Sequence, residues 1–210
     1  MKIRRHIGGI LQANCYIISP SHTEDNAKAP CFIIDPGYDP KILMKLLNEN
    51  HLEPQAILLT HHHVDHSGSA DILRKELDIP ILIHREDADM YREGADRFLE
   101  DGDILKLGEE GKGSKGVKLK VLHTPGHTRG GICLMSERDK VCFTGDTIFN
   151  VDLGRTDLED GSQAEMVRSI RSVVDTWGND ITIYPGHGDE ATMKIVRKRN
   201  REFLEIVNGN

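Results

Sequence analysis

A short apolar run that ends in a dense group of histidines constrains this chain more than any other feature. Residues 56–60 read AILLT and are too few for a helix, so we expect a strand buried on both faces. Residues 61–66 follow directly and read HHHVDH. Four histidines and an aspartate at the end of a buried strand indicate a metal site, and a histidine-rich surface loop is the alternative interpretation.

The spacing of these side chains favours two metal ions. In extended backbone, side chains two positions apart point the same way, so His61 and His63 can hold one ion as a pair. Asp65 and His66 lie where the chain should turn into the next helix. They can therefore face a neighbouring point a few ångströms away instead of the same ion.

Three further candidate ligands occur in one recurring local setting. His127, Asp146 and His187 each come after an apolar strand-like run, and each directly follows a glycine. Glycine permits backbone angles and close approaches that other residues resist, so each ligand can be directed inward from a tight turn. With the first group they make five histidines and two aspartates, a set suited to two ions.

Length, charge and cysteine usage limit the function classes. The 210 residues predict one domain with a sizeable core, because domains usually span roughly 100–200 residues. The net charge of −7 offers no cationic field for a phosphate backbone, so nucleic acid is not an expected partner. No run approaches the roughly 18 apolar residues of a membrane-spanning helix, and we see no signal peptide. Buried free thiols and a cytoplasmic protein are indicated by the isolated Cys15, Cys31, Cys133 and Cys142.

Apolar periodicity predicts strands and helices in both halves of the chain. The first half should contain a helix that opens at Asp39-Pro40 and another that begins near Ser67. In the second half, Ser162 should cap a helix ended by Gly178, and a closing helix should follow residue 193. Strands are expected over residues 14–19, 31–35, 56–60, 79–84, 104–107, 117–121, 131–135, 141–144 and 181–184, with loops over 21–30 and 108–116.

Two halves of this kind predict four layers in the order α, β, β, α. Two sheets would pack face to face, and the helices would cover their outer faces. We therefore expect a single α/β domain over residues 1–210 with the architecture of an αββα sandwich.

The order of the candidate ligands resembles that of a known family. Thr-His-x-His-x-Asp-His, then Gly-His, Gly-Asp and Gly-His, is similar to the pattern of the metallo-β-lactamase superfamily. Within it, the chain most resembles the glyoxalase II type, the hydroxyacylglutathione hydrolases, and particularly their short single-domain relatives. The resemblance implies the αββα metallo-β-lactamase fold with a dinuclear site at one edge of the sheets. It implies that His61, His63 and His127 hold the first metal, that Asp65, His66 and His187 hold the second, and that Asp146 bridges them.

The resemblance also implies a reaction. Two divalent ions, zinc or otherwise iron or manganese, would lower the pKa of a bridging water so that hydroxide is available at neutral pH. This hydroxide, positioned by metals that Asp65 and Asp146 hold, would attack the acyl carbon of a small-molecule thioester. A thiolate with a pKa near 8.5 leaves without a strong proton donor, which suits a site with no obvious general acid. We expect the chain to lack the C-terminal helical domain with which longer glyoxalase II enzymes bind glutathione, so hydroxyacylglutathione and other acyl thioesters are alternative substrates.

Several residues near the candidate ligands have two interpretations. His62 should point away from the paired histidines, in a supporting or packing role. Asp35 either orients a ligand histidine or is a turn residue before Pro36-Gly37. Arg155 either binds a carboxylate of the substrate or pairs with Asp157. Surface or packing roles are expected for His6, His22, His51, His84 and His123.

Two other functions compete with the hydrolase. A persulfide dioxygenase would use one iron held by His61, His127 and Asp146, whereas the presence of a further ligand set favours two metals. A non-catalytic binding module of the same fold would be expected to lack some ligands, and all seven are present. Counting the metals in the purified protein separates the hydrolase from the dioxygenase.

Overall fold

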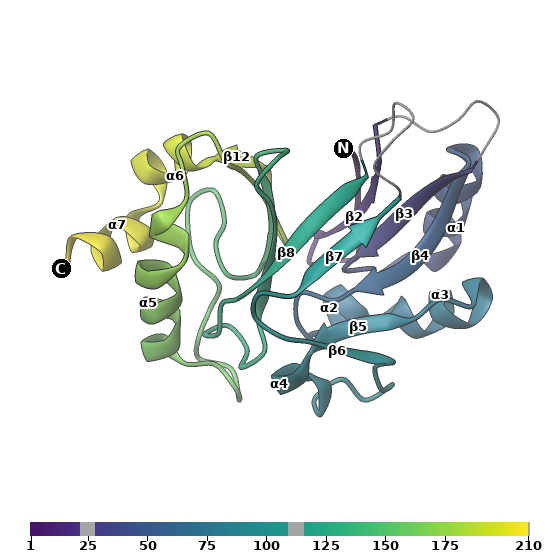
Figure 1. The fold of residues 1–210 in the computed structure, drawn as a ribbon. Helices are drawn as coiled ribbons and strands as arrows, with labels where there is room; N and C mark the ends of the chain where they lie inside the picture. Colours follow the sequence, from purple (N-terminus) through teal and green to yellow (C-terminus); the bar gives the residue numbers. More distant parts are fainter. Residues whose placement is uncertain (22–27, 109–115, 210) are drawn as a thin grey trace.

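The computed structural model describes residues 1–21, 28–108 and 116–209, which form two packed halves (Figure 1). Each half contains one six-stranded sheet with helices against its outer face. The predicted αββα sandwich is therefore confirmed. His22 and most of the two loops predicted over residues 21–30 and 108–116 lie outside the described residues.

The first sheet is formed by the first half of the chain. Its strands lie side by side in sequence order, antiparallel from β1 to β3 and parallel from β3 to β6. β1 has no apolar run in the sequence and was therefore not predicted. It lies at the sheet edge, where its residues are mostly exposed or half-buried. The bounds are β1 Lys2–Gly8, β2 Ala13–Ser19, β3 Ala29–Ile34, β4 Leu52–Leu58, β5 Ile81–His84 and β6 Arg97–Leu99.

The second sheet is formed by the second half of the chain, in the reverse spatial order from β12 to β7. Adjacent strands within this sheet are antiparallel, except for β10 and β11, which are parallel to each other. A backbone hydrogen bond from Ile132 N to Thr60 O, at 2.9 Å, joins this sheet to the end of β4. The bounds are β7 Ile104–Leu107, β8 Val117–His123, β9 Ile132–Ser136, β10 Val141–Gly145, β11 Thr182–Pro185 and β12 Ala191–Thr192.

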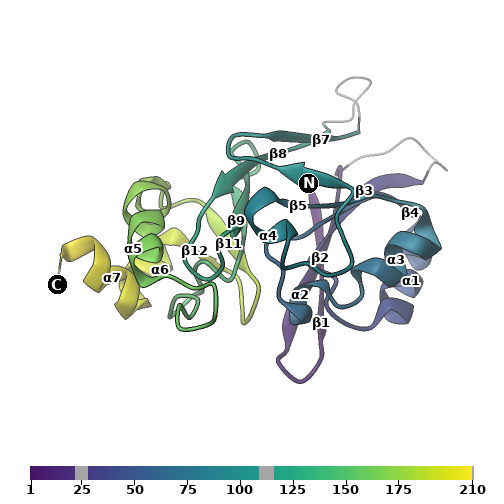
Figure 2. The same ribbon diagram turned by 90° about the horizontal axis from the view of Figure 1, so that it is seen from below.

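The longer helices cover the outer faces of the two sheets, as the view from below also shows (Figure 2). The first sheet carries α1 Pro40–Glu49 and α3 Ala70–Leu77, and the second carries α5 Gln163–Ser172, α6 Met193–Arg199 and α7 Arg201–Asn208. Two single-turn helices, α2 Val64–Ser67 and α4 Arg85–Ala88, follow strands β4 and β5, and a 3₁₀ turn spans Val174–Thr176.

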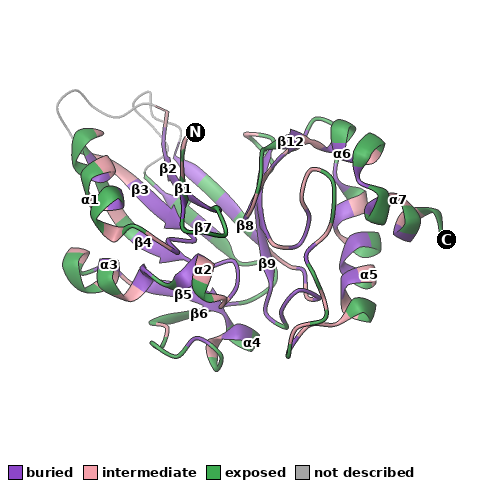
Figure 3. Cartoon of the chain, turned by 180° about the vertical axis from the view of Figure 1, so that it is seen from behind, coloured by how far each residue is buried: buried purple, intermediate pink, exposed green. Residues whose placement is uncertain are grey.

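Alternating side chains along the strands build three apolar layers. On β2, Tyr16 and Ile18 point between the sheets, whereas Cys15 and Ile17 point toward α1 and α3. This period of two is the reason that a strand buried on both faces reads as a continuous apolar run. Strands such as β2, β9 and β10 are accordingly buried throughout, and many exposed residues lie on the outward faces of the helices (Figure 3).

The ends of the helices differ from the predicted ones in several places. Ser162 does cap α5, because its Oγ accepts a hydrogen bond from Glu165 N, but the helix ends at Ser172 and not at Gly178. Asp39 precedes α1 in a left-handed conformation and its carboxylate contacts His6 instead of capping the helix. The closing helix is split in two, because Asn200 ends α6 and caps α7 through Phe203 N.

The burial of the cysteines and the length of the helices bear on two expectations from the sequence. Cys15, Cys31, Cys133 and Cys142 are buried free thiols. Within residues 1–21, 28–108 and 116–209, no helix has the length and apolarity needed to cross a membrane.

Candidate metal centre

All seven candidate ligands lie at strand ends that meet where the two sheets come together. The segment from His61 to His66 follows β4 of the first sheet, and α2 begins within it. His127, Asp146 and His187 follow β8, β10 and β11 of the second sheet. Each half of the molecule therefore contributes part of the centre.

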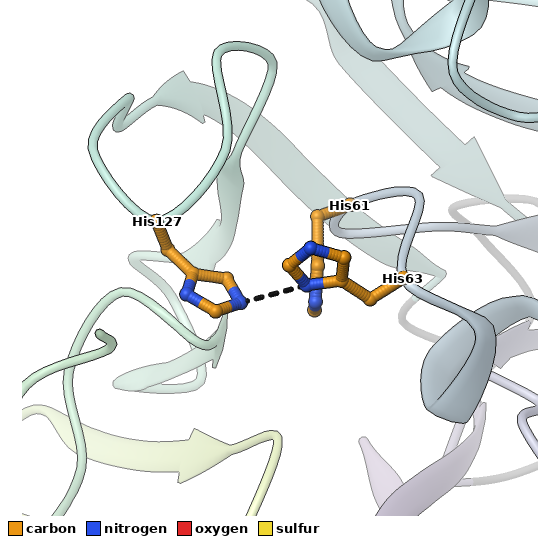
Figure 4. A group of neighbouring side chains, drawn as sticks. All are labelled: His61, His63 and His127. Carbon is orange, nitrogen blue, oxygen red and sulfur yellow. Dashed lines mark hydrogen bonds between the residues drawn. The ribbon is translucent and has the colours of Figure 1, made fainter. Parts of the chain in front are cut away.

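The first group consists of His61, His63 and His127 (Figure 4). Each offers one ring nitrogen, and these atoms lie within 4.8 Å of one another. His63 Nδ1 and His127 Nε2 are 2.9 Å apart. Three imidazole nitrogens that converge in this way are suited to a divalent ion with one open coordination position.

The second group consists of Asp65, His66 and His187, whose ligand atoms also lie within 4.8 Å of one another. His66 Nε2 is 3.2 Å from His187 Nε2, and His187 Nε2 is 3.3 Å from Asp65 Oδ2. The two groups are the same sets that the family resemblance assigns to the first and second metal.

Asp146 lies between the two groups. Its Oδ2 is 3.5 Å from His127 Nε2 in the first group and 3.5 Å from His187 Nε2 in the second. Its Oδ1 is 3.4 Å from His66 Nε2. A single carboxylate therefore reaches both groups, which is the placement required of a bridging ligand.

The donor atoms of this centre fit divalent cations. Buried atoms that lack a hydrogen-bond partner among the described residues include His61 Nε2 and Asp146 Oδ1. A buried polar atom without a partner is costly, and an ion coordinated by these atoms would remove that cost. The nitrogen and oxygen donors are compatible with zinc, iron or manganese.

Local electrostatics set the protonation of the histidines. Burial, reinforced by neighbouring imidazoles, lowers the pKa of His61, and the same two causes lower the pKa of His63 to about 4. Both rings are therefore neutral near pH 7 and can offer a lone pair. For His66, burial lowers the pKa, but Asp146 and Asp35 outweigh it and raise the pKa to about 9. A cation at this position would compete with that proton.

Most ligand histidines are oriented by a second contact on the opposite ring nitrogen. His61 Nδ1 is 3.1 Å from Thr60 Oγ1, and His66 Nδ1 is 3.2 Å from Asp35 Oδ2. The other two contacts are to backbone carbonyl oxygens, from His127 Nδ1 to Arg155 O and from His187 Nδ1 to Leu11 O. Such contacts fix the ring orientation and leave the other nitrogen for a metal.

Asp35 has the orienting position that was one of its two interpretations. Its carboxylate contacts His66 and also accepts hydrogen bonds from Thr60 N at 2.7 Å and from Thr60 Oγ1 at 2.6 Å. The residue is buried and has a φ of 50°, a conformation that is uncommon for a non-glycine residue. The turn and the orienting contact are therefore both present.

Glycines allow the ligand segments to approach each other. A β-carbon at residue 186 would overlap Asp146 Oδ1 and would lie 2.6 Å from His66 Cε1. A β-carbon at Gly37 would overlap the carbonyl oxygen of Asp65. Both positions require glycine, because atoms of the candidate ligands Asp146, His66 and Asp65 occupy the space that a β-carbon would need.

His62 is not a member of the first group, but its ring does not point away from that group as predicted, because it lies against the ring of His63 with the centroids 4.7 Å apart. Its Nδ1 is 3.1 Å from Asp87 Oδ2, and its amide donates to the same oxygen at 3.0 Å. His62 also belongs to a looser set with His63 and Asp160, and the His62 Nδ1 to Asp160 Oδ2 distance is 3.8 Å. Because Asp87 already engages its Nδ1, the supporting role agrees best with this geometry.

Arg155 pairs with Asp157. The guanidinium donates to both carboxylate oxygens, from Nε at 2.7 Å and from Nη2 at 2.8 Å. Both side chains are exposed. Arg155 nevertheless lines a cavity of about 510 Å³ that also touches His127, Asp146 and His187. The pairing that the sequence suggests is present, and the side chain also lies beside the centre.

Sequence reasoning missed two residues that support the ligand loops. Asn14 is fully buried, and its Nδ2 donates to the carbonyl oxygens of Pro185 and Gly188 on either side of His187. Asp87 is also fully buried and contacts the loop of His62. A polar residue at the start of an apolar strand was the available signal for Asn14, whereas Asp87 lies in an ordinary charged stretch that gives none.

The family is settled by comparison with known proteins. A model of the metallo-beta-lactamase superfamily matches residues 8–193. The chain belongs to this superfamily. Members of this superfamily are generally metal-dependent hydrolases, and the candidate ligand groups and the two-sheet fold of this chain are compatible with that chemistry.

Relatives of similar length carry more specific names. The hydroxyacylglutathione hydrolase GloC of Haemophilus influenzae is 34% identical over 92% of this chain and 93% of its own length. The probable metallo-hydrolase YqgX of Bacillus subtilis is 32% identical over 95% of this chain and 96% of its own length.

Solved structures share the fold. The B3 metallo-beta-lactamase BLEG-1 is similar with a TM-score of 0.82 and 28% identity, over 95% of this chain and 98% of that one. TTHA1623 in a di-iron-bound form has a TM-score of 0.76 and 27% identity, over 94% and 98%. ETHE1 from Myxococcus xanthus has a TM-score of 0.82 over 99% and 89%, but at 22% identity it shows the fold alone.

Proposed function

We propose that this superfamily member is a dinuclear metal-dependent hydrolase that cleaves small acyl thioesters, in the manner of a hydroxyacylglutathione hydrolase. The observation that carries the proposal is the pair of ligand groups with Asp146 between them. A single-metal site would need only the first group and Asp146. The second group, formed by Asp65, His66 and His187, would then bind no metal.

Each side chain has a distinct part in this proposal. His61, His63 and His127 would hold the first ion, Asp65, His66 and His187 would hold the second, and Asp146, which lies between the two groups, would serve both. When bound, the two ions would lower the pKa of water and polarise a carbonyl group. The surrounding contacts of Asp35 and Thr60 keep the rings in place, so little reorganisation is needed during the reaction.

A thioester is the substrate class that agrees best with the chain. GloC, a relative over nearly the whole length, is named a hydroxyacylglutathione hydrolase. A thiolate is also a good leaving group that needs no strong acid beside it. Arg155 lies at the edge of the cavity beside His127 and pairs with Asp157. We propose that a carboxylate of the substrate replaces Asp157 as the partner of this guanidinium.

Zinc is the proposed metal, with iron or manganese as alternatives that the same donors accept. The related TTHA1623 was obtained in a di-iron-bound form, so iron is a specific alternative for a chain of this type. We further propose that the protein acts in the cytoplasm on small molecules and not on nucleic acid, in keeping with its free cysteines and its net charge of −7.

The deciding experiment combines metal analysis with a thiol-release assay. The protein is purified without chelator, its metals are counted, and glutathione and non-glutathione thioesters are offered at pH 7. Two metals per chain and metal-dependent thiol release are expected. One iron per chain, with oxygen uptake in the presence of a persulfide, would replace the hydrolase by a dioxygenase.

A further inference from the structure

A buried carboxylate outside the ligand groups connects the loops that carry them. Asp87 lies in α4, directly after β5, and is fully buried. Its Oδ2 accepts hydrogen bonds from His62 N at 3.0 Å and from Thr128 Oγ1 at 2.9 Å, and it lies 3.1 Å from His62 Nδ1. Its Oδ1 accepts a hydrogen bond from Gly130 N at 2.5 Å. A buried carboxylate is tolerated only with such partners.

The hydrogen-bond partners of Asp87 lie in two loops, each of which follows a strand of a different sheet. His62 stands between His61 and His63, in the loop that leaves β4 of the first sheet. Thr128 directly follows His127, in the loop that leaves β8 of the second sheet. The three histidines of the first group are thus divided between two loops, and both loops are hydrogen-bonded to one carboxylate.

The second loop packs closely against Asp87. A β-carbon at Gly130 would lie 2.7 Å from Asp87 Oδ1 and 2.8 Å from Asp87 Cβ, and it would overlap Asp87 N. Only glycine fits there without displacing the loop. Hydrogen bonds and steric fit together therefore fix the distance between the loops at this point.

The second ligand group is held by other contacts. His66 is oriented by Asp35, and the His187 loop is held by Asn14. Asp87 contacts both loops of the first group, the His61–His66 segment and the His127 loop, whereas it contacts only one of the two loops of the second group, because Asp65 and His66 share the His61–His66 segment and His187 lies elsewhere. A change at Asp87 should therefore affect the two metal sites unequally.

We propose that Asp87 is a positioning residue that sets the separation of the His61–His63 and His127 loops and thereby the affinity of the first metal site. The inference rests on the proposed dinuclear centre. Asp87 touches neither metal nor substrate in this role, and it acts only through the two loops.

The test measures zinc binding to Asp87→Asn and to the unmodified protein. Metal-free protein is titrated with Zn²⁺ against a chelating dye, which gives the affinity of each site. Removal of a supporting hydrogen-bond partner typically weakens metal binding by about 10–100-fold, and we expect about tenfold at the first site with a smaller loss at the second. Cobalt(II) titration should show a larger change in the visible absorption bands for one of the two equivalents than for the other.

The activity readout is the division between kcat and KM. In Asp87→Asn, kcat should fall at limiting zinc and recover in excess zinc, with KM for the thioester unchanged. A merely structural residue would lower the melting temperature without this rescue by metal.

A matched control is Asp96→Asn. Asp96 Oδ2 also accepts a backbone hydrogen bond, from Ile81 N at 2.8 Å at the start of β5, and pairs with Arg74 Nη1 at 3.6 Å, and neither Ile81 nor Arg74 lies in a ligand loop. Both zinc affinities should match those of the unmodified protein. If Asp87→Asn does not fold, Thr128→Val removes one of the two hydrogen bonds that link Asp87 to the second loop, leaves the bond from Gly130 N, and should weaken the same site to a smaller degree.

The outcomes separate this inference from the proposed function. Equal zinc affinities in the variant and the unmodified protein, or an equal loss at both sites, would overturn the role of Asp87. A larger loss at the first site supports it even if no thioester is hydrolysed, in which case only the proposed function fails. An unmodified protein that binds fewer than two ions would overturn both.

Discussion

At the scale of single residues, the candidate ligands have clearer signals in the sequence than the residues that support them. Histidines at positions 61 and 63 share a side by strand geometry, and the glycine before each later ligand gave a recognisable local signal. The contacts of Asp87 and Asn14 join residues far apart in the chain, so the local sequence does not indicate their partners, even though Asn14 is a polar residue at the start of an apolar strand. Buried hydrogen bonds of this type depend on how the sheets pack, which sequence spacing does not contain.

Replacing Asp146 by Ala tests the bridge. The substitution removes the one carboxylate that reaches both ligand groups, so metal content should fall and turnover should drop by about 100-fold or more. Metal analysis and initial rates measured on the same sample check this result. Unchanged activity at full metal content would contradict the assigned role.

Opposite substitutions test the pairing at Arg155. Arg155→Ala should raise KM for a thioester that carries a carboxylate, whereas Asp157→Ala should lower it by releasing the guanidinium from its partner. A thioester of similar size without a carboxylate is the control and should show neither change. A lower melting temperature of Arg155→Ala with an unaltered KM would instead assign a structural role to the ion pair.

At the scale of the elements, the predicted strands are correct where they are buried on both faces and incomplete where they are not. β9 and β10 lie within one residue of the predicted runs, whereas β4 spans Leu52–Leu58 instead of the predicted 56–60, and the strands β1, β6 and β12 were not predicted. Helix ends were harder, because the turn after Ser172 and the break at Asn200 depend on packing against the second sheet. The glycine turns after β10 and β11 are the elements that matter most for the centre.

Gly186→Ala tests one of these turns. The added methyl group would overlap Asp146 Oδ1 and crowd His66, so both side chains must shift and zinc affinity should fall by about tenfold or more. Gly178→Ala is a suitable control, since its β-carbon would meet only the exposed side chain of Asp180. Competitive zinc titration of both variants measures the difference. Equal affinities would show that the turn adapts to the methyl group.

At the scale of the whole molecule, the joint between the halves contains a pair of stacked histidines. His84 at the end of β5 and His123 at the end of β8 have ring centroids 4.0 Å apart and planes 15° apart. Burial, and then the neighbouring His123, lower the pKa of His84 from its ordinary value of 6.5. The unfolded chain therefore binds a proton here at a pH where the folded chain does not.

This proton linkage predicts a pH dependence of stability. As pH falls below 6.5, protonation favours the unfolded state, so the metal-free protein should lose stability until the folded pKa of His84 is also passed. His84→Asn removes the titrating group and keeps an acceptor for Glu86 N. Its melting temperature should fall less than that of the unmodified protein between pH 7.5 and pH 5.5. Identical slopes would exclude His84 as a source.

The division of the centre between two consecutive halves has a consequence for biosynthesis. During translation the segment that follows β4 is synthesised before His127 and His187. At that stage His61, His63 and His66 lack the other members of their ligand groups. If the centre binds two ions as proposed, stable binding would begin only after the later sheet has docked on the earlier one. Each ion would then hold together two halves that no disulfide joins, and metal content would report how many molecules have completed assembly.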